Sequence, residues 1–472
     1  MHPKYTAGAP PCQFAETQKC MMRLDFGKAT QEKERAFAHI PRRRTALTEL
    51  LRRFIMKLSD LKRALARFRN DHKREDTMPN IQDYVLWRGD LPLERVPLCD
   101  VDALLLSYLS YMPYDNIVRE AFDEGIALRD AAQKLLEVNE RDKTPLAYNV
   151  KEDRKLLATL MESARFADIR LVGYTNKVDP KLEEQFSAVT YLLGEGRAFI
   201  AFRGTDNTVV GWKEDFNMSF ETEVPAQRDA VAYAQQVAAS IELPLIVGGH
   251  SKGGNLAAYA GMFVDEATRA RIQTVYNFDG PGFNEATISS EAFGKVDMRI
   301  RTFVPQSSMI GILMWHREPF TVVRSNGVGV FQHDAYTWQI MGGDFMKLTE
   351  RTGHSHFADD TIKRWLEELS PDMRRQAIDG IYAVLSASDG MNVSDLFEAR
   401  NTMSVLKAAG AMDEKTRSAV FEAFRLLGSS MIGGVPGWLE RAASSVAQKM
   451  PWEQRKEEAK ALAAQNPPEL AK

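Results

Sequence analysis

The sequence has few cysteines, no long hydrophobic run and no strong excess of either charge. Its three cysteines, Cys12, Cys20 and Cys99, form no CxxC pair. This excludes a disulfide-stapled secreted scaffold and is typical of a reducing compartment. A net charge of −3 excludes a chain built along its whole length to attract nucleic acid.

Long apolar segments are also lacking. No stretch reaches the roughly 18 apolar residues that cross a bilayer, and the first twenty residues lack the apolar run of a signal peptide. We therefore expect a cytoplasmic protein. A hydrophobic content of 44% is enough for a full core, and 472 residues suggest two or three units.

Charge is uneven along the chain. Residues 1–77 carry 18 Lys and Arg against 9 Asp and Glu, and residues 1–41 have the patternless composition of a disordered segment. Residues 42–74 have the 3/4 spacing of a basic amphipathic helix. Three readings stay open: peripheral contact with an anionic membrane or a partner, a solvated helix packed on the main domain, or translation from Met78. The apolar stripe is Leu47, Leu50, Leu51, Phe54, Leu58, Leu61, Leu65 and Phe68.

Residues 78–370 have the pattern of one α/β domain. Helical patterns fill about 100–166, and strand and helix patterns then alternate. The later strands are apolar throughout, as strands buried on both faces are. We predict a mostly parallel central sheet with helices on both faces, followed by a helical C-terminal region over 371–472. The strand segments are IRLVGYT, FSAVTYLL, RAFIAFRG, LPLIVGG, TVYNFDG, RIRTFVP and FTVVRS.

A serine lies at the junction of one such strand with a helix, in IVGGHSKGGNLAAYAG (246–261). Gly249 and Gly253 flank Ser251 in a G-x-S-x-G pattern, and glycine permits a turn that a Cβ would block. Such a turn exposes the hydroxyl above the strand end and aims the backbone N–H of Lys252 at a developing oxyanion. The alternative is a plain glycine-rich turn.

The serine needs a base, which in hydrolases with this elbow follows the nucleophile in sequence. His333 follows the last strand pattern, where the next turn would bring it over Ser251. His316 has the appearance of a helix end, whereas His354 and His356 lie in a polar loop.

An acid and a second oxyanion donor are also needed. Asp279 closes the strand after the nucleophile helix, at the edge where sites of open α/β sheets lie. Asp334 is a rival, although a side chain adjacent to His333 in sequence is poorly placed to reach its ring. Thr205 follows the strand AFIAF and can offer its backbone N–H and hydroxyl. A turn cap for Asp279 and an ordinary strand end for Thr205 are the alternatives.

With these residues in place, the chain is similar to class 3 lipase-type α/β-hydrolases, and within them to an uncharacterised bacterial branch. The resemblance covers roughly residues 79–390. It implies that Thr205 carries an oxyanion donor, Ser251 is the nucleophile and His333 is the base. Its markers are AFRGTD, GWKEDF, GGHSKGGNLA, FDGPGF, VPQSSMIGIL and QHDAYTWQI.

The acid departs from that family. Class 3 lipases take it from the loop after the next strand, where this chain reads RTFVPQSSMIG without a carboxylate. Asp279 instead matches the acid of the pancreatic lipases. The expected function is hydrolysis of carboxylic esters or lipids without metal or cofactor, through Ser251, His333 and Asp279, with Thr205 and Lys252 as oxyanion donors. A thioesterase or small-ester esterase, or a binding scaffold on a retired hydrolase fold, remain alternatives.

Overall fold

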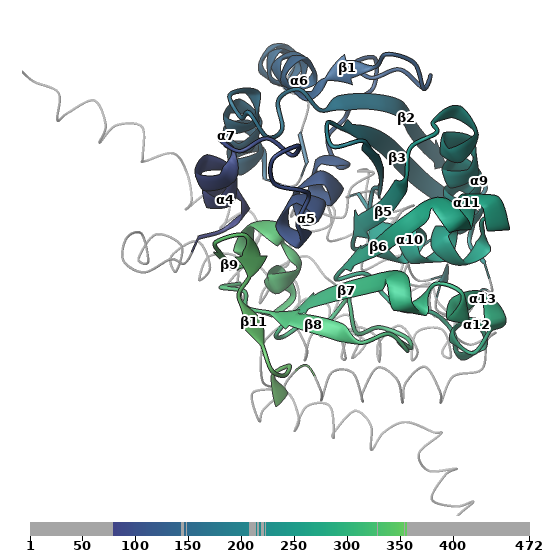
Figure 1. Cartoon of the computed structure of the whole chain (residues 1–472). Coiled ribbons are helices and arrows are strands. Elements are labelled where there is room, and N and C mark those ends of the chain that lie inside the picture. Colours follow the sequence, from purple (N-terminus) through teal and green to yellow (C-terminus); the bar gives the residue numbers. More distant parts are fainter. Residues whose placement is uncertain are drawn as a thin grey trace, which may run out of the picture.

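The computed structural model describes residues 79–142, 146–147, 149–206, 214, 217–218, 221, 223–327, 329–353 and 355 (Figure 1). The predicted amphipathic helix over 42–74 and the helical region over 371–472 lie outside these residues. The domain boundaries therefore stay predictions.

A nine-stranded sheet forms the centre of the molecule. The five strands β4 to β8 run parallel to one another, whereas β1 to β4 and the pair β8–β11 are antiparallel. In spatial order the strands are β1 (Ile126–Ala127), β2 (Arg170–Asp179), β3 (Glu184–Leu193), β4 (Arg197–Phe202), β5 (Leu245–His250), β6 (Ile272–Phe278), β7 (Ile300–Pro305), β8 (Phe320–Val323) and β11 (Lys347–Leu348). A separate hairpin pairs β9 (Ile340–Met341) with β10 (Asp344–Phe345).

The α/β fold with a large sheet is as predicted, but the parallel arrangement covers only its middle. Short turns join β2 to β3 and β3 to β4, and so short a connection can only reverse the chain. The β4 to β5 connection has room for a helix and returns the chain in the same direction. The predicted mostly parallel sheet is thus found in β4 to β8, and antiparallel strands extend it at both edges.

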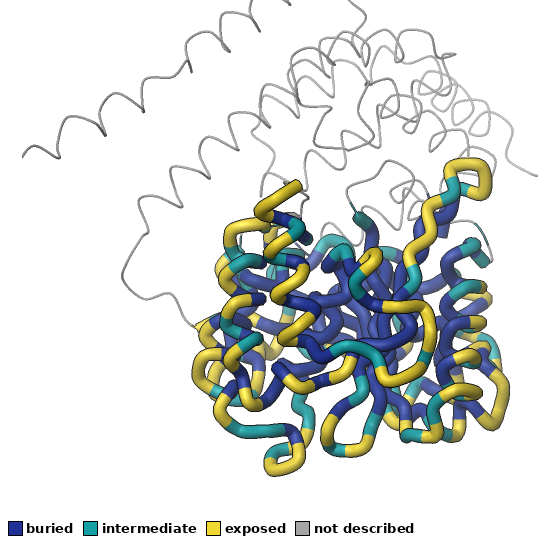
Figure 2. Tube along the Cα trace, turned by 90° about the horizontal axis from the view of Figure 1, so that it is seen from above, coloured by how far each residue is buried: buried dark blue, intermediate teal, exposed yellow. Residues whose placement is uncertain are grey.

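Helices cover both faces of the sheet (Figure 1). The two faces form separate cores: Phe199 and Ile246 pack with the N-terminal helices, whereas the next residues along each strand, Ile200 and Val247, pack with the central helices. In Figure 2 the centre of the described part is buried, and the exposed residues lie around it. The N-terminal helices are α4 (Ile81–Arg88), α5 (Asp100–Leu109), α6 (Leu128–Asp142) and α7 (Val150–Met161). The others are α9 (Pro225–Ser240), α10 (Lys252–Phe263), α11 (Glu266–Arg271), α12 (Glu285–Ile288) and α13 (Glu291–Gly294).

Local sequence explains where the two central helices lie. Pro225 occupies the first turn of α9, where a missing N–H costs little, and buried residues recur along it with helical spacing. Helix α10 is buried from Lys252 to Met262, because it crosses the middle of the sheet. Its small residues let the backbone lie close to the strands.

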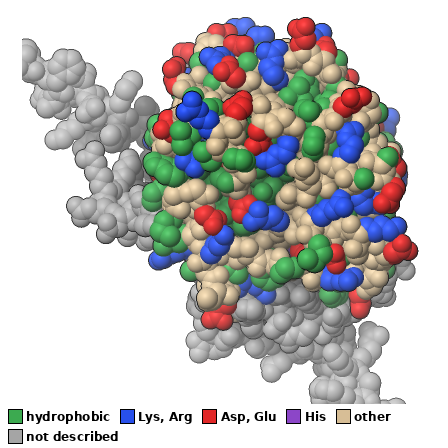
Figure 3. All heavy atoms as spheres, in the orientation of Figure 1, with side chains coloured by type: hydrophobic (Ala, Val, Ile, Leu, Met, Phe, Trp, Pro, Cys, Tyr) green, Lys and Arg blue, Asp and Glu red, His purple; other side chains and the backbone are tan. Residues whose placement is uncertain are grey.

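The described surface carries both charges. On the face in Figure 3, acidic and basic side chains are interspersed with hydrophobic and neutral ones. Such mixing gives no one-signed field over that face. No helix in the described part of the chain is long and apolar enough to cross a bilayer.

Candidate active site

Strand β5 passes into α10 through Ser251, whose backbone is strained. Its φ of 60° and ψ of −134° lie outside the regions that a residue with a side chain normally occupies. The turn is fixed from both sides: the Ser251 N–H donates to Phe278 O at 2.9 Å, and the Ser251 carbonyl accepts from Gly254 N at 2.9 Å. Strain of this kind persists only where the surrounding structure enforces it, and it clusters at functional sites.

The flanking glycines allow three chain segments to touch. A Cβ on Gly249 would lie 2.2 Å from the carbonyl carbon of Gly253, and a Cβ on Gly253 would lie 2.1 Å from Phe202 O. Both obstacles are backbone atoms, which cannot rotate away. The predicted need for glycine at these two positions therefore has a steric cause.

Ser251 is less open than the sequence suggested. Only 9% of its surface is exposed, whereas a freely exposed hydroxyl was expected. The loop after β4 explains part of this, because a Cβ on Gly204 would lie 3.0 Å from Ser251 Cβ. Thr205, the next residue, is buried. The structure thus brings the loop with the predicted oxyanion donor against the serine.

Lys252 is the first residue of α10, so its backbone N–H is among those that the helix itself leaves without an acceptor. Its side chain was not predicted to matter, yet it is fully buried. The Nζ donates to Glu214 Oε2 at 2.8 Å, Gln185 O at 2.7 Å and Gln185 Oε1 at 2.8 Å. Glu214 is equally buried. This ion pair ties Glu214 to the elbow.

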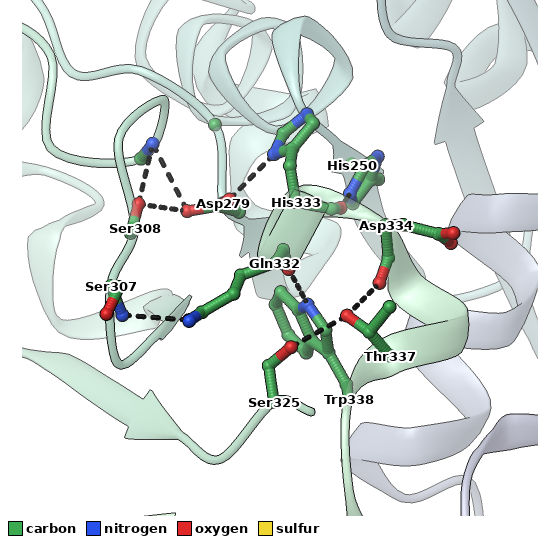
Figure 4. A network of polar contacts seen from close by, with 12 residues as sticks. His250, Asp279, Ser307, Ser308, Ser325, Gln332, His333, Asp334, Thr337 and Trp338 are labelled. Atoms are coloured by element: carbon green, nitrogen blue, oxygen red, sulfur yellow. Dashed lines mark hydrogen bonds and ion pairs between the residues drawn. The ribbon is translucent and has the colours of Figure 1, made fainter. Parts of the chain in front are cut away.

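Asp279 and His333 meet at the carboxyl edge of the sheet (Figure 4). His333 ends the short 3-10 helix η2 (Gly329–His333), and its Nδ1 lies 2.6 Å from Asp279 Oδ2. The Asp279 side chain is 1% exposed and that of His333 is 24% exposed. Asp279 also has a positive φ, of 52°, a conformation that aspartate tolerates better than most residues. The carboxylate is thus buried and the ring reaches toward solvent.

A second histidine links the elbow to the His333 loop. His250 Nε2 lies 2.8 Å from the His333 carbonyl, and the two rings are 4.5 Å apart between centroids. Because a carbonyl only accepts, Nε2 carries the proton, and Nδ1 faces the Tyr111 hydroxyl at 3.1 Å. Burial, and next the neighbouring His333, hold the pKa of His250 well below its usual value. The ring is therefore neutral and acts as a fixed link.

Further contacts hold the loop in place. Gln332 O accepts from the Trp338 indole at 2.9 Å, and Gln332 Oε1 accepts from Ser307 N at 2.9 Å. The Tyr336 hydroxyl donates to the buried Asp153 at 2.9 Å. Tyr336 belongs to η3 (Ala335–Thr337) and Asp153 to α7, so the N-terminal helices support the loop that carries His333.

The other candidates for the acid and the base have different contacts. The Asp334 carboxylate caps η3 by accepting from Tyr336 N at 3.0 Å. His316 was expected at a helix end, but it lies in the segment without regular secondary structure that precedes β8. Its Nδ1 is 3.0 Å from Glu318 Oε1, and both side chains are buried. His354 and His356 lie outside the described residues.

In the part that the structure describes, the chain of hydrogen bonds from Asp279 through His333 does not continue to Ser251. Among the hydrogen bonds of the described residues, none joins the Ser251 hydroxyl to the His333 ring. Such contacts are often long before substrate binds.

A shallow depression of about 600 Å³ by the β3–β4 turn, lined in part by Glu94 and Arg197, lies at the opposite end of the strands from Ser251. Within the described ranges, no group of three or more His, Cys, Asp or Glu residues could hold a metal ion.

Comparison with known proteins gives a family match and distant structural similarities. The profile of a family described as Mbeg1-like matches residues 160–383. No curated protein matches the chain. Lipase II from Rhizopus niveus is 15% identical over 38% of this chain and 72% of its own, with a TM-score of 0.28. The Rhizomucor miehei lipase propeptide complex is 13% identical over 42% and 67%, with a TM-score of 0.26. A structure titled M37 lipase is 16% identical over 44% and 67%, with a TM-score of 0.26.

Proposed function

We propose that this chain is a serine hydrolase of carboxylic esters with an α/β-hydrolase fold. The observation that carries the proposal is the strained Ser251 at the β5–α10 junction. A plain turn would place a glycine at this φ and ψ, since glycine adopts them without strain. A serine there indicates that its hydroxyl is used.

In the proposed reaction the Ser251 Oγ attacks the ester carbonyl carbon while His333 Nε2 takes the hydroxyl proton. Asp279 Oδ2 accepts the Nδ1 proton at 2.6 Å, which fixes the tautomer and stabilises the charged ring. The C–O bond of the ester then breaks, and His333 returns the proton to the leaving alcohol. Water completes the cycle by the same steps on the acyl-serine.

The negative charge on the former carbonyl oxygen needs two donors. We assign them to the backbone N–H groups of Lys252 and Thr205. Lys252 N–H opens α10, so the partial positive charge of the helix N-terminus adds to the donor. Gly204 supports the second assignment, because its approach to Ser251 Cβ brings the Thr205 peptide to the elbow.

A fluorophosphonate probe tests the proposal, because it labels only an activated serine. We expect labelling of the full chain and none after Ser251→Ala, with an unchanged thermal melt. Retained labelling or near wild-type ester turnover in Ser251→Ala would refute the serine mechanism. A scaffold without activity would fail to react in both forms.

The acid is tested by a matched pair of carboxylates. Asp279→Asn leaves the shape intact but favours the wrong His333 tautomer, and we expect turnover to fall by about 10⁴. Asp334→Asn should change turnover by less than about threefold, because that carboxylate caps a backbone N–H. The opposite ranking would assign the role to Asp334.

The substrate is a further part of the proposal. The resemblance to class 3 lipases favours acyl esters of lipid type. A panel of esters and thioesters of increasing acyl length, presented with and without a lipid interface, separates a lipase from a small-ester esterase or thioesterase. A preference for long chains at the interface is the expected result.

A further inference from the structure

The carboxylate of Asp279 has two oxygens with different surroundings. Oδ2 faces the His333 ring, while Oδ1 accepts from the Ser308 hydroxyl at 2.5 Å and from Gly311 N at 3.2 Å (Figure 4). Ser308 and Gly311 both belong to the loop after β7, which pairs with β6, the strand that ends just before Asp279. The loop after β7 thus forms a cradle for the oxygen that does not touch the base.

The cradle fits closely. Ser308 is 1% exposed, and its hydroxyl also accepts from Gly311 N at 3.1 Å, which fixes its direction. A Cβ on Gly311 would lie 2.3 Å from Asp279 Oδ1, so a side chain at 311 would displace the carboxylate. The Ser308 carbonyl is itself held by the Ser355 hydroxyl at 2.8 Å.

The terminal torsion of an aspartate is broad, so the carboxylate plane is not fixed by its own rotamer. Hydrogen bonds to one oxygen set the direction of the other. A neutral hydroxyl that donates to a carboxylate makes a stronger bond than one between neutral groups. Ser308 therefore influences the orientation of the His333 ring through the Asp279 carboxylate, without contacting the ring.

We propose that Ser308, with the Gly311 N–H, is a positioning residue that turns Asp279 Oδ2 toward His333, an inference that rests on the proposed function of the same site. Its loss leaves Oδ1 with the longer bond to Gly311 N alone. The base is then held in a wider range of orientations, which lowers the rate of proton transfer more than substrate binding.

The chain offers a matched control one residue away. Ser307 is on the same loop, but its hydroxyl contacts Thr352 Oγ1 at 2.8 Å instead of the carboxylate. Its bond to Gln332 comes from the backbone N–H, which alanine retains. Ser308→Ala should lower kcat by about 10- to 100-fold with KM within about twofold. Ser307→Ala should leave both within about twofold, and Ser308→Thr should recover most of kcat.

A double-mutant cycle separates positioning from general damage. If Ser308 acts through Asp279, then Ser308→Ala should change the probe-labelling rate by less than about twofold in an Asp279→Asn background. An equal loss in both backgrounds would overturn the inference, as would an unchanged kcat in Ser308→Ala or an equal loss in Ser307→Ala.

A spectroscopic readout makes the result independent of turnover. The proton between His333 Nδ1 and Asp279 Oδ2 should give a downfield ¹H NMR signal that Asp279→Asn removes. We expect the signal unchanged in Ser307→Ala and shifted or broadened in Ser308→Ala. A wild-type chain that neither labels nor hydrolyses esters would refute the proposed function alone, whereas an unmoved signal in Ser308→Ala would refute the positioning role.

Discussion

Gly249→Ala tests the steric account of the elbow most directly. The new methyl group would lie 2.2, 2.3 and 2.7 Å from the C, O and Cα atoms of Gly253. Ordinary carbon contacts are about 3.5–4.0 Å, so α10 would have to move by about 1 Å. Gly253 cannot yield, because its other side faces Phe202 O, 2.1 Å from where its own Cβ would be.

Overpacking of this kind costs about 1–3 kcal/mol, and a rigid backbone obstacle places Gly249→Ala near the upper end. For a domain of this size, about 3 kcal/mol lowers the melting temperature by roughly 6–12 °C. Moving the first turn of α10 also moves Ser251 relative to its partners. A displacement near 1 Å is expected to cost about 10² in turnover.

Gly261→Ala is the control within the same helix. The nearest atom to its Cβ is the side-chain methyl Val275 Cγ2 at 3.2 Å, which can shift by a few tenths of an ångström. Alanine is favoured over glycine in a helix by about 0.8–1 kcal/mol, so this variant should melt no lower than the wild type. Thermal melts followed by circular dichroism decide the comparison. Gly249→Ala within about 1 °C of the wild type would refute the steric argument.

Two further predictions concern buried charges. Lys252→Met leaves the Glu214 carboxylate buried without its cation. We expect urea denaturation to show that the free energy of unfolding falls by about 3–5 kcal/mol, and that adding Glu214→Gln largely restores it. A fall of less than about 1 kcal/mol would contradict this. Burial, and next the hydrogen bond and charge of Asp229, raise the pKa of Glu184 from 4.5 to about 7. The protonated Glu184 side chain is favoured in the folded state over the unfolded state. Its contribution to the free energy of unfolding is therefore complete below about pH 4.5 and is lost as the pH rises through 7. The difference in free energy of unfolding between Glu184→Gln and the wild type should therefore shift in favour of the variant by on the order of 1 kcal/mol from pH 4.5 to pH 8. An equal difference at both pH values would contradict the pKa shift.

Much of the strand and helix pattern can be predicted from local sequence. RAFIAFRG contains β4, and LPLIVGG covers β5 except for its last residue, because apolar runs bounded by Gly, Pro or charged residues are typical of buried strands. The antiparallel direction of β2 and β3 does not show in the apolar pattern, and only the short connections on either side of β3 indicate it. The two-residue strands β9 to β11 are too short to show a period.

The site was predictable only in part, for the same reason. Asp279 and His333 follow strands that end at one edge of the sheet, so topology brings them together. The cradle from Ser308 and the link from His250 depend on loop conformation, which carries no periodic signal. The prediction that His316 lies at a helix end was wrong, because the apolar run ILMW before it has the composition of a helix end without forming one.

The contacts that support the His333 loop join distant parts of the chain, which bears on the order in which the protein folds. Strands β2 to β4 pair through short turns, whereas Tyr336 and Asp153 are 183 residues apart. Asp100 meets Tyr276 and Arg301 across 176 and 201 residues. Closing such loops costs entropy before any contact is gained, so these pairings are expected to form late. A refolding chain should then regain much of its circular dichroism signal while Ser251 is still inert to the probe, and reactivity should return only when Trp338 becomes buried.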